Sequence, residues 1–362
     1  MKKRTIFIAT SSFTSTINYQ FKRLGEEFTK DNINVVFILD CPNHLLPINR
    51  NKITYYNWPS KRPTKIKDFI FLFKLIKKYK PYMTMSMFGS GNIMTLIAFF
   101  FRVKNRIIWI RTTSQQTEID SDNKLKYKFL ITRKRIIYRL NTHIYTNSKG
   151  TLIDSINKKF VKNQNTGVYT NLFSPSNIKY INLKDRSQSI IIAGRLHKSK
   201  GHIKLIKQFK DVLSEFPDIK LKIIGNGNLK EEIISYSKKN NVFDNIVFIN
   251  SLPQKELFVT FANSLVIINS SVSESFGNTM VESLREGTPV LATKTEGSTE
   301  IINNKNGLFY SNDIKFSLLK NLNKVMNNWE SYSENAITSF NENFNIDSKI
   351  SSYSNNMLKE YK

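Results

Sequence analysis

The sequence predicts an α/β protein with two doubly wound, Rossmann-like domains, each built on a parallel sheet. Short apolar runs alternate with longer amphipathic segments along the first half, and the same alternation starts again after a polar stretch near the middle. This alternation is typical of parallel sheets, because a crossover helix must return the chain before the next parallel strand can begin. The length of 362 residues is sufficient for two such domains.

The first predicted domain covers residues 1–172. Its apolar runs predict strands at 5–9, 34–39, 82–87, 106–110 and 143–145. The amphipathic segments between them predict helices at 17–29, 65–80, 93–101, 125–140 and 151–160. A linker is predicted at 173–188, where Pro175, Asn residues and mixed charges interrupt the pattern.

The second predicted domain covers residues 189–345 and repeats the alternation. Apolar runs predict strands at 190–193, 220–224, 246–248, 265–269, 290–292 and 307–309, with helices between them. The tail, residues 346–362, has the pattern of an amphipathic helix. We therefore expect a second doubly wound domain followed by a C-terminal helix that crosses back to the first domain, as is common in this fold class.

Residues 270–290 contain the most informative pattern in the chain. Glu274 and Phe276 lie in a predicted strand-to-helix loop, Gly277-Asn278-Thr279 begins the helix, and Glu282 lies on it. The unpaired amides and positive dipole of a helix N-terminus suit a phosphate group. Ionised carboxylates only accept hydrogen bonds, so Glu274 and Glu282 suit hydroxyl-rich groups on either side of that phosphate. This arrangement predicts a nucleotide-sugar site.

Two glycine turns follow the first two strands of the second domain. In the first, Gly194-Arg195 and then Lys200 follow the strand 190–193, at the edge where open α/β sheets bind ligands. Arg offers a planar fork of donors and Lys a point charge, so together they can neutralise a diphosphate without a metal ion. The second turn, Gly225-Asn226-Gly227, follows the strand 220–224.

These motifs resemble those of the retaining GT-B glycosyltransferases, in particular glycosyltransferase family 4. The pair Glu274 and Glu282 matches the family's E-x7-E motif, and Arg195 with Lys200 matches its G-R-x-x-x-x-K-G element. The resemblance implies two Rossmann-like domains facing a central cleft, a nucleotide diphosphate donor and no required metal. UDP-sugars are favoured as donors, with GDP-mannose as the main competitor.

The resemblance also implies roles for the individual residues. Arg195 and Lys200, with the amides near Gly277, would stabilise the departing diphosphate; Glu274 would hold the donor hexose and Glu282 the ribose. The wider donor site would consist of Gly194, Gly225, Asn226, Gly227, Leu252, Phe276, Gly277, Asn278, Thr279 and Glu282. The chain departs from the family at Glu296, which stands where the first Gly of a Gly-Gly-x-x-Glu element is usual.

The first half matches the family by architecture alone. Its first loop, 11–16, lacks the family's glycine-rich pattern, and the segment 109–114 lacks the histidine that many relatives carry. Arg111, at the predicted end of a strand, is a candidate for binding an acceptor phosphate or sugar, although a surface position is an equal alternative. Gly89 and Ser90, which follow another strand, are further acceptor candidates.

Positive charge is concentrated in the first half. Residues 1–172 contain 31 basic and 9 acidic residues, a net charge of +22, whereas the remainder contains 24 basic and 19 acidic residues, a net charge of +5. The predicted helices 65–80 and 125–140 place Lys and Arg beside aromatic and aliphatic residues, which suits the surface of an anionic bilayer. The first half is therefore predicted to bind the inner face of the cell membrane.

The remaining features limit the function. One cysteine, Cys41, excludes an intramolecular disulfide and favours a reducing compartment, so we expect a cytoplasmic, membrane-associated enzyme. The expected acceptor is a lipid-linked or growing bacterial-type surface glycan. A basic nucleic-acid-binding protein, motivated by the high net charge, and a GT-B phosphorylase or inactive scaffold are the alternatives.

Overall fold

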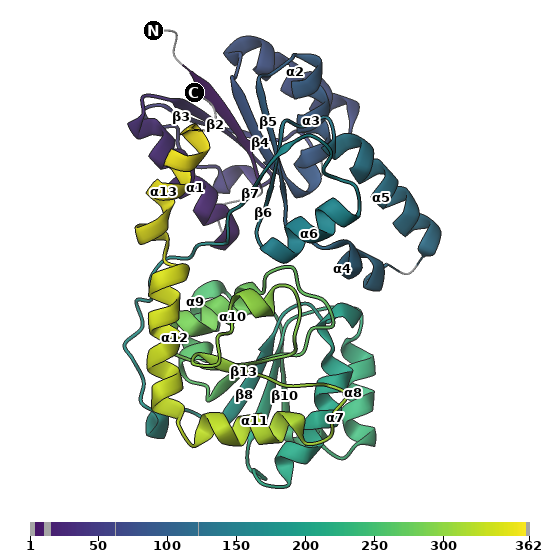
Figure 1. The fold of residues 1–362 in the computed structure, drawn as a ribbon, viewed down its shortest axis with the longest axis vertical. Coiled ribbons are helices and arrows are strands. Elements are labelled where there is room, and N and C mark those ends of the chain that lie inside the picture. The colour runs from purple at the N-terminus through teal and green to yellow at the C-terminus, as the bar shows by residue number, and fades with distance from the viewer. Residues whose placement is uncertain (1–3, 11–15, 62, 122, 360–362) are drawn as a thin grey trace. The chain divides into compact units, whose positions relative to one another are not determined.

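The computed structural model describes residues 4–10, 16–61, 63–121 and 123–359, and the chain forms two compact units (Figure 1). The first unit comprises Met1–Ser114, Asn123–Ser174 and Ile346–Lys362, and the second comprises Gln115–Asp122 and Pro175–Asn345. The short segment Gln115–Asp122 thus packs with the second unit, although it lies within the first domain predicted from the sequence.

The first unit contains a seven-stranded sheet with the order β3-β2-β1-β4-β5-β6-β7, and every neighbouring pair is parallel. The strands are β1 (Thr5–Ala9), β2 (Asn34–Leu39), β3 (Ile53–Asn57), β4 (Met83–Met87), β5 (Asn105–Ile110), β6 (His143–Thr146) and β7 (Asn165–Val168). The helices are α1 (Thr16–Lys30), α2 (Ile66–Tyr79), α3 (Gly91–Phe100), α5 (Lys124–Tyr138) and α6 (Lys149–Asn157). Helix α4 (Ser114–Ile119) lies almost entirely in the segment that packs with the second unit.

The sequence prediction omitted the two edge strands of this sheet, β3 and β7. The strand β3 reads Ile-Thr-Tyr-Tyr-Asn and β7 reads Asn-Thr-Gly-Val, so neither contains the apolar run of a central strand. Edge strands need fewer apolar residues, because one side of the strand has no neighbour and much of the strand is exposed. Pairing with β2 and β6 therefore determines these strands more than their own composition does.

The C-terminal helix α13 (Ile346–Lys359) packs against α1 in the first unit. Ile346, Ile350 and Met357 are buried in the same apolar cluster as residues of β1, β2, β4 and α1. An ion pair of 2.8 Å between Arg23 Nη1 and Asp347 Oδ1 joins the two helices at their surface. Burial of these three apolar side chains is the larger contribution, at roughly 2 kcal/mol for each fully buried side chain.

The second unit contains a six-stranded parallel sheet with the order β10-β9-β8-β11-β12-β13. Its strands are β8 (Ser189–Ala193), β9 (Lys220–Ile224), β10 (Ile246–Ile249), β11 (Val266–Asn269), β12 (Val290–Ala292) and β13 (Gly307–Phe309). Its helices are α7 (His202–Leu213), α8 (Lys230–Lys239), α9 (Gln254–Ala262), α10 (Asn278–Arg285), α11 (Ser317–Met326) and α12 (Trp329–Asn343).

Apolar clusters cover both faces of this second sheet. Helices α7, α8 and α11 pack on one face through residues such as Leu205, Ile233 and Leu322. Helix α9 packs on the opposite face, where Phe258 and Phe261 join residues of β8, β9 and β11. The strand order reverses between β8 and β11, and ligands of open α/β sheets bind outside the carboxyl ends of strands at such a reversal.

Candidate functional site

The two predicted glycine turns lie against each other at the carboxyl ends of β8 and β9. The Gly194 amide donates a hydrogen bond to the Ile224 carbonyl oxygen at 2.9 Å. Gly225 lies so close that a methyl group there would overlap the Gly194 carbonyl oxygen. Their φ angles, +154° for Gly194 and +140° for Gly225, also favour glycine. The turns therefore form one tightly packed edge.

Lys200 is held in place by the loop that follows β11. Gly201 has a φ of +67°, and a methyl group on it would overlap the Ser270 carbonyl oxygen. The Ser270 hydroxyl donates to the Lys200 carbonyl oxygen at 2.7 Å, and the Val272 amide donates to the Ser199 carbonyl oxygen at 2.8 Å. These contacts join two loops that are about seventy residues apart in the sequence.

This junction brings Lys200 and Glu274 into an ion pair between Nζ and Oε2. Their side chains are 19% and 8% exposed, so the pair is partly shielded from water. The Ser271 hydroxyl donates to the same carboxylate oxygen at 3.4 Å. A lysine ammonium has three donor hydrogens, so Lys200 can contact an anion while it remains paired with Glu274. Two of the three predicted catalytic residues are thus in direct contact.

Helix α10 begins beside this pair. Gly277 is its N-cap with a φ of +103°, and the first turn, which includes Asn278 and Thr279, contains no acidic residue. The positive end of the helix dipole is therefore not compensated by the helix's own side chains. Phe276 is 1% exposed, and its ring packs edge-on to Phe344 with centroids 6.0 Å apart. The buried ring anchors the loop that carries Glu274.

Residues from two predicted motifs line one small void. Gly194 and Lys200 contribute from the turn after β8, and Thr279 contributes from the first turn of α10, together with Asn269 and Ser271. Glu282 lies one helical turn after the start of α10 and is 7% exposed. These two motifs therefore converge at the reversal of strand order.

A glycine in the loop after β12 supports the same region. The Gly297 amide donates to the Glu274 carbonyl oxygen at 2.9 Å, and a methyl group at this position would overlap the backbone of Phe276. The preceding Glu296, which departs from the family pattern, is exposed. The second glycine of the Gly-Gly-x-x-Glu element thus keeps a structural function here, whatever residue precedes it. The Glu300 of this element ends a short 3-10 turn, Ser298–Glu300.

Arg195 lies apart from the Lys200–Glu274 pair. Its side chain is 63% exposed, and its Nη2 atom is 3.8 Å from Asp120 Oδ2. Asp120 also accepts a hydrogen bond of 3.2 Å from the Ser199 amide. The sequence analysis did not identify Asp120, because an isolated carboxylate outside any motif gives no signal in one sequence. The structure thus adds Asp120 to the turn that carries both basic residues.

The remaining predicted donor residues lie at the ends of β9 and β10. The Asn226 amide nitrogen is 3.3 Å from the Ser251 hydroxyl, which joins the two loops. A methyl group on Gly227 would overlap the Leu196 carbonyl oxygen, so this glycine is required for close backbone packing. Leu252 is half-buried against the apolar cluster under α9. These residues lie at the end of the site nearest β10, which is the outermost strand on that side of the sheet.

His202 is a buried titratable group next to the candidate site. It is 2% exposed, and neither ring nitrogen has a hydrogen-bond partner within the described residues. Burial, with smaller contributions from Lys200 and His197, lowers the pKa of His202 to about 4. The imidazole is therefore neutral at physiological pH and adds no charge beside Lys200.

The acceptor candidates in the first unit have different surroundings. Arg111 is 7% exposed, so the alternative of a surface position is wrong. Its Nη2 atom donates to Asn171 Oδ1, its guanidinium lies 5.9 Å from the Phe21 ring centroid, and burial lowers its pKa to about 9. The Ser90 hydroxyl donates to the Met87 carbonyl oxygen at 2.8 Å.

Gly89 is the least constrained of the acceptor candidates. It is exposed, and a methyl group there would meet no atom within 4 Å. The predicted difference from the family in the first loop falls largely on residues 11–15, which lie outside the described residues. No group of three or more His, Cys, Asp or Glu side chains suited to a metal ion occurs in the described part of the chain.

Comparisons with known proteins indicate the class of enzyme. Residues 174–339, a little under half of the chain, match the family described as glycosyl transferases group 1. An uncharacterized glycosyltransferase of Methanocaldococcus jannaschii is 27% identical over 280 residues, which cover 70% of this chain and 67% of that protein. A Campylobacter jejuni N-acetylgalactosamine-N,N'-diacetylbacillosaminyl-diphospho-undecaprenol 4-alpha-N-acetylgalactosaminyltransferase is 27% identical over 65% of this chain and 64% of its own length.

The fold comparison covers both units. The Anabaena protein HepE, solved in complex with UDP and glucose, has a TM-score of 0.74 at 14% identity, covering 99% of this chain and 100% of that chain. The prediction of two Rossmann-like α/β domains of the GT-B class is confirmed. The family match and the relatives also confirm the predicted enzyme class: the chain is a glycosyltransferase, and its second half matches the group 1 family.

Proposed function

We propose that the chain is a retaining glycosyltransferase of family 4 that transfers a hexose from a nucleotide diphosphate sugar to a lipid-linked or growing glycan acceptor. The observation that carries the proposal is the Lys200–Glu274 ion pair beside the N-terminus of α10, whose first turn contains no acidic residue. A cation and a helix N-terminus suit the diphosphate, and a shielded carboxylate suits hydroxyl groups of the sugar. UDP is the favoured nucleotide, supported by the UDP bound to a protein of the same fold.

The proposed reaction uses these residues to stabilise charge. When the bond between the sugar's anomeric carbon and the phosphate oxygen breaks, negative charge grows on the diphosphate. Lys200, Arg195 and the amides at the start of α10 would interact most strongly with that charge in the transition state. Glu274 would hold hexose hydroxyls, and Glu282 the ribose. The acceptor oxygen would bond to the same face of the anomeric carbon, and its proton would pass to the leaving phosphate.

The donor experiment compares Lys200→Ala and Glu282→Ala with a control, Lys207→Ala. Lys207 is an exposed lysine on α7, the helix that begins two residues after Lys200. Thermal shifts would be measured with UDP, GDP and their hexose conjugates, followed by transfer assays with the donor that binds. We expect a lower turnover or a higher donor KM in the first two variants and unchanged values in Lys207→Ala. Unchanged values in all three variants would sink the assignment.

The proposed donor chemistry requires no metal ion. Lys200 and Arg195 supply the positive charge that a divalent ion would otherwise bring to the diphosphate. Transfer should therefore persist after dialysis against a chelator and should not rise when Mg²⁺ or Mn²⁺ is restored. A return of activity on addition of either ion would contradict this part of the proposal.

We further propose that the first unit docks on an anionic membrane surface, at the cytoplasmic face of the cell membrane. Helix α2 packs against α3, and α3 packs against α5. These three helices expose large apolar side chains, and α2 and α5 also carry Lys and Arg residues. We call this surface the basic apolar surface, and its apolar members are Ile66, Ile70, Phe73, Phe99, Phe100, Leu125, Phe129 and Ile136. A groove of about 510 Å³ between α2 and α3 adds Phe69 and Ile97, with Lys74 and Lys77 among its lining residues.

The chemistry of the basic apolar surface fits a bilayer interface. Exposed rings and aliphatic groups can enter the headgroup region, while neighbouring Lys and Arg side chains attract anionic lipids. No helix in the described part of the chain is long and apolar enough to cross a membrane. Docking is also consistent with an acceptor carried on a lipid, such as the diphospho-undecaprenol named in the Campylobacter relative.

Vesicle flotation tests this docking. The chain should float with vesicles that contain about one third phosphatidylglycerol and remain in solution with pure phosphatidylcholine. Replacing Ile70 and Phe129 with Glu should abolish flotation, whereas the same replacement of Val247 and Val259, exposed apolar residues of the second unit, should not. Equal flotation of both double variants would contradict docking through the basic apolar surface, and preferential binding to nucleic acid would favour the alternative function.

A further inference from the structure

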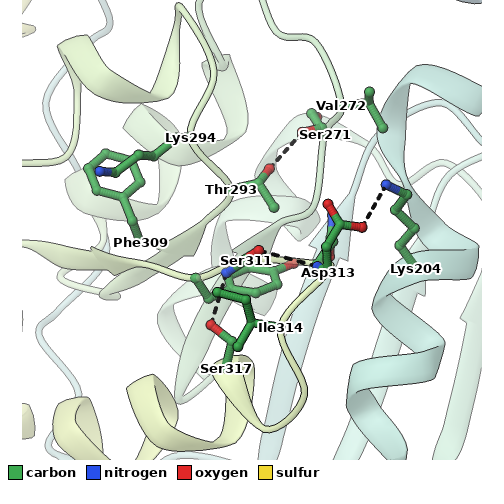
Figure 2. Close-up of a pocket in the computed structure, with 12 residues that line it drawn as sticks. Lys204, Ser271, Val272, Thr293, Lys294, Phe309, Ser311, Asp313, Ile314 and Ser317 are labelled. Atoms are coloured by element: carbon green, nitrogen blue, oxygen red, sulfur yellow. Dashed lines mark hydrogen bonds and ion pairs between the residues drawn. The ribbon is translucent and has the colours of Figure 1, made fainter.

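A second cavity lies in the second unit, at the carboxyl ends of β11, β12 and β13 (Figure 2). Its volume is about 530 Å³, which lies within the usual range of small-molecule sites, roughly 300–1,000 Å³. The walls come from α7, the loops after these three strands and the start of α11. Arg195, Lys200 and Glu282 are not among its lining residues, so the cavity is distinct from the candidate donor site.

One wall of the cavity is a loop that its own hydrogen bonds fix in place. The Ser311 amide donates to the Ser317 hydroxyl at 2.9 Å, and the Asp313 amide donates to the Ser311 hydroxyl at 3.2 Å. Gln208 from α7 donates to the Ile314 carbonyl oxygen at 2.8 Å. Figure 2 shows Lys204 reaching Asp313 at the rim, where their charged atoms are 3.3 Å apart. The cavity is therefore formed by an ordered segment.

The polar groups in this wall indicate a ligand with hydroxyl groups. The Asn312 side-chain nitrogen donates to the Ser270 carbonyl oxygen at 3.2 Å, which fixes the orientation of the amide. Its Oδ1 atom is buried and has no hydrogen-bond partner in the part of the chain that the structure describes. Leaving such an acceptor unsatisfied costs about 1–3 kcal/mol, so a hydroxyl donor from a ligand would stabilise it.

The opposite side of the cavity offers an aromatic ring and a cation. Lys294 Nζ lies 5.6 Å from the centroid of the Phe309 ring, and Figure 2 shows the two side chains stacked together. Lys294 makes no ion pair with any described acidic residue. A ring beside hydrogen-bonding groups suits a sugar, which has apolar C–H faces and hydroxyl edges.

We propose that this cavity binds a saccharide unit other than the donor hexose. Asn312 would accept a hydrogen bond from a sugar hydroxyl, Phe309 would contact a C–H face, and Lys294 would donate to a further oxygen. Ser271 connects this cavity to the donor site, because it lines the cavity and its hydroxyl donates to Glu274 at 3.4 Å. This connection rests on the proposed function, whereas saccharide binding by the cavity does not.

The test measures sugar binding while UDP occupies the nucleotide part of the donor site, and matched variants separate the cavity from the donor hexose position. Saturation-transfer NMR would be recorded on the full chain with saturating UDP and, in turn, glucose, galactose, mannose, N-acetylglucosamine and N-acetylgalactosamine. Linked trisaccharides of glucose and of N-acetylglucosamine form a second arm. Binding of the single sugars would show that the cavity binds a free monosaccharide. Binding of the trisaccharides alone would show that it binds a sugar unit only within a glycan chain.

Matched variants assign the signal to the cavity. Asn312→Ala removes the buried acceptor, and Asn321→Ala is its control, because each loses one side-chain hydrogen bond to a backbone carbonyl but Asn321 does not line the cavity. Lys294→Ala is paired with Lys305→Ala, another exposed lysine of the second unit. We expect at least tenfold weaker sugar binding in Asn312→Ala and Lys294→Ala, with both controls unchanged and all four melting normally.

Two results would overturn the proposal. One is the absence of a signal from every sugar and trisaccharide in UDP-saturated protein. The other is equal binding by Lys294→Ala, Lys305→Ala and the unmodified chain, which keeps the test decisive even where Asn312→Ala fails to fold. Failure of the proposed function would appear separately, as the absence of any thermal shift with UDP, GDP or their sugar conjugates.

Discussion

The two units share a doubly wound fold but use their surfaces in different ways. In the second unit, glycine turns and short hydrogen bonds pack the loops at the carboxyl ends of the strands, and this packing brings Lys200 to Glu274. In the first unit, most of the large exposed apolar side chains lie on helices, and helices α2 and α5 add Lys and Arg residues beside them. The proposed donor chemistry therefore depends on fixed loops, whereas the proposed membrane docking depends on the composition of helices.

The largest expected difference between the units is catalytic. Lys200→Ala should lower the turnover about 10²–10³-fold, because it removes a preorganised cation from the developing diphosphate charge. Lys124→Ala, on a basic helix of the first unit, should leave turnover on a soluble acceptor analogue unchanged. Steady-state transfer kinetics of both variants provide the measurement, and a comparable loss in Lys124→Ala would remove the distinction between the units.

The next difference concerns backbone packing. Gly225→Ala should destabilise the chain by about 3 kcal/mol or more, because the residue has a φ of +140° and a methyl group would overlap the Gly194 carbonyl oxygen. Gly89→Ala places its methyl group where no atom lies within 4 Å, so we expect a change within about 0.5 kcal/mol. Urea unfolding of both variants tests the pair, and similar midpoints would contradict the packing described for the glycine turns.

These glycine turns also show why the site in the second unit was easier to predict from the sequence. Its predicted residues belong to local patterns, such as a strand followed by Gly and a basic residue, and such a pattern can be recognised in a single sequence. The contact of Ser270 with Lys200 joins distant loops and leaves no local pattern. For the same reason the sequence did not identify Asp120 in the second unit. It also did not predict that Arg111 in the first unit is buried, because that burial depends on packing against Phe21 and Asn171.

A smaller difference is expected in the response to acid. His202 in the second unit and His143 in the first each have a pKa lowered to about 4, mainly by burial, from an ordinary value of 6.5. The folded chain therefore binds fewer protons than the unfolded chain between pH 4 and 6.5. Each histidine thus contributes stability that is complete above about pH 6.5 and is lost as the pH falls toward 4. For His202 the loss could reach about 3 kcal/mol.

The two histidines differ in their partners. His143 has Thr142 and Asn165 within hydrogen-bond distance of its two ring nitrogens, whereas the described residues supply none to His202. His202→Gln should therefore flatten the dependence of unfolding free energy on pH between 4 and 6.5, measured by urea unfolding at several pH values. His143→Gln should flatten the slope by a comparable amount, because the pKa of His143 is lowered equally far. An unchanged slope in His202→Gln would contradict the assignment of a neutral buried imidazole.

The smallest expected effect is that of single charges on membrane binding. Lys126→Ala, on α5 of the first unit, should weaken partition onto anionic vesicles about fivefold, since one Lys near such a surface contributes roughly 1 kcal/mol. Lys238→Ala, on α8 of the second unit, removes the same charge from the chain but not from the basic apolar surface. If net charge alone drives binding, both variants lose affinity equally. If the basic apolar surface docks as a unit, Lys126→Ala loses more, and raising the salt concentration removes the difference because the charges are exposed.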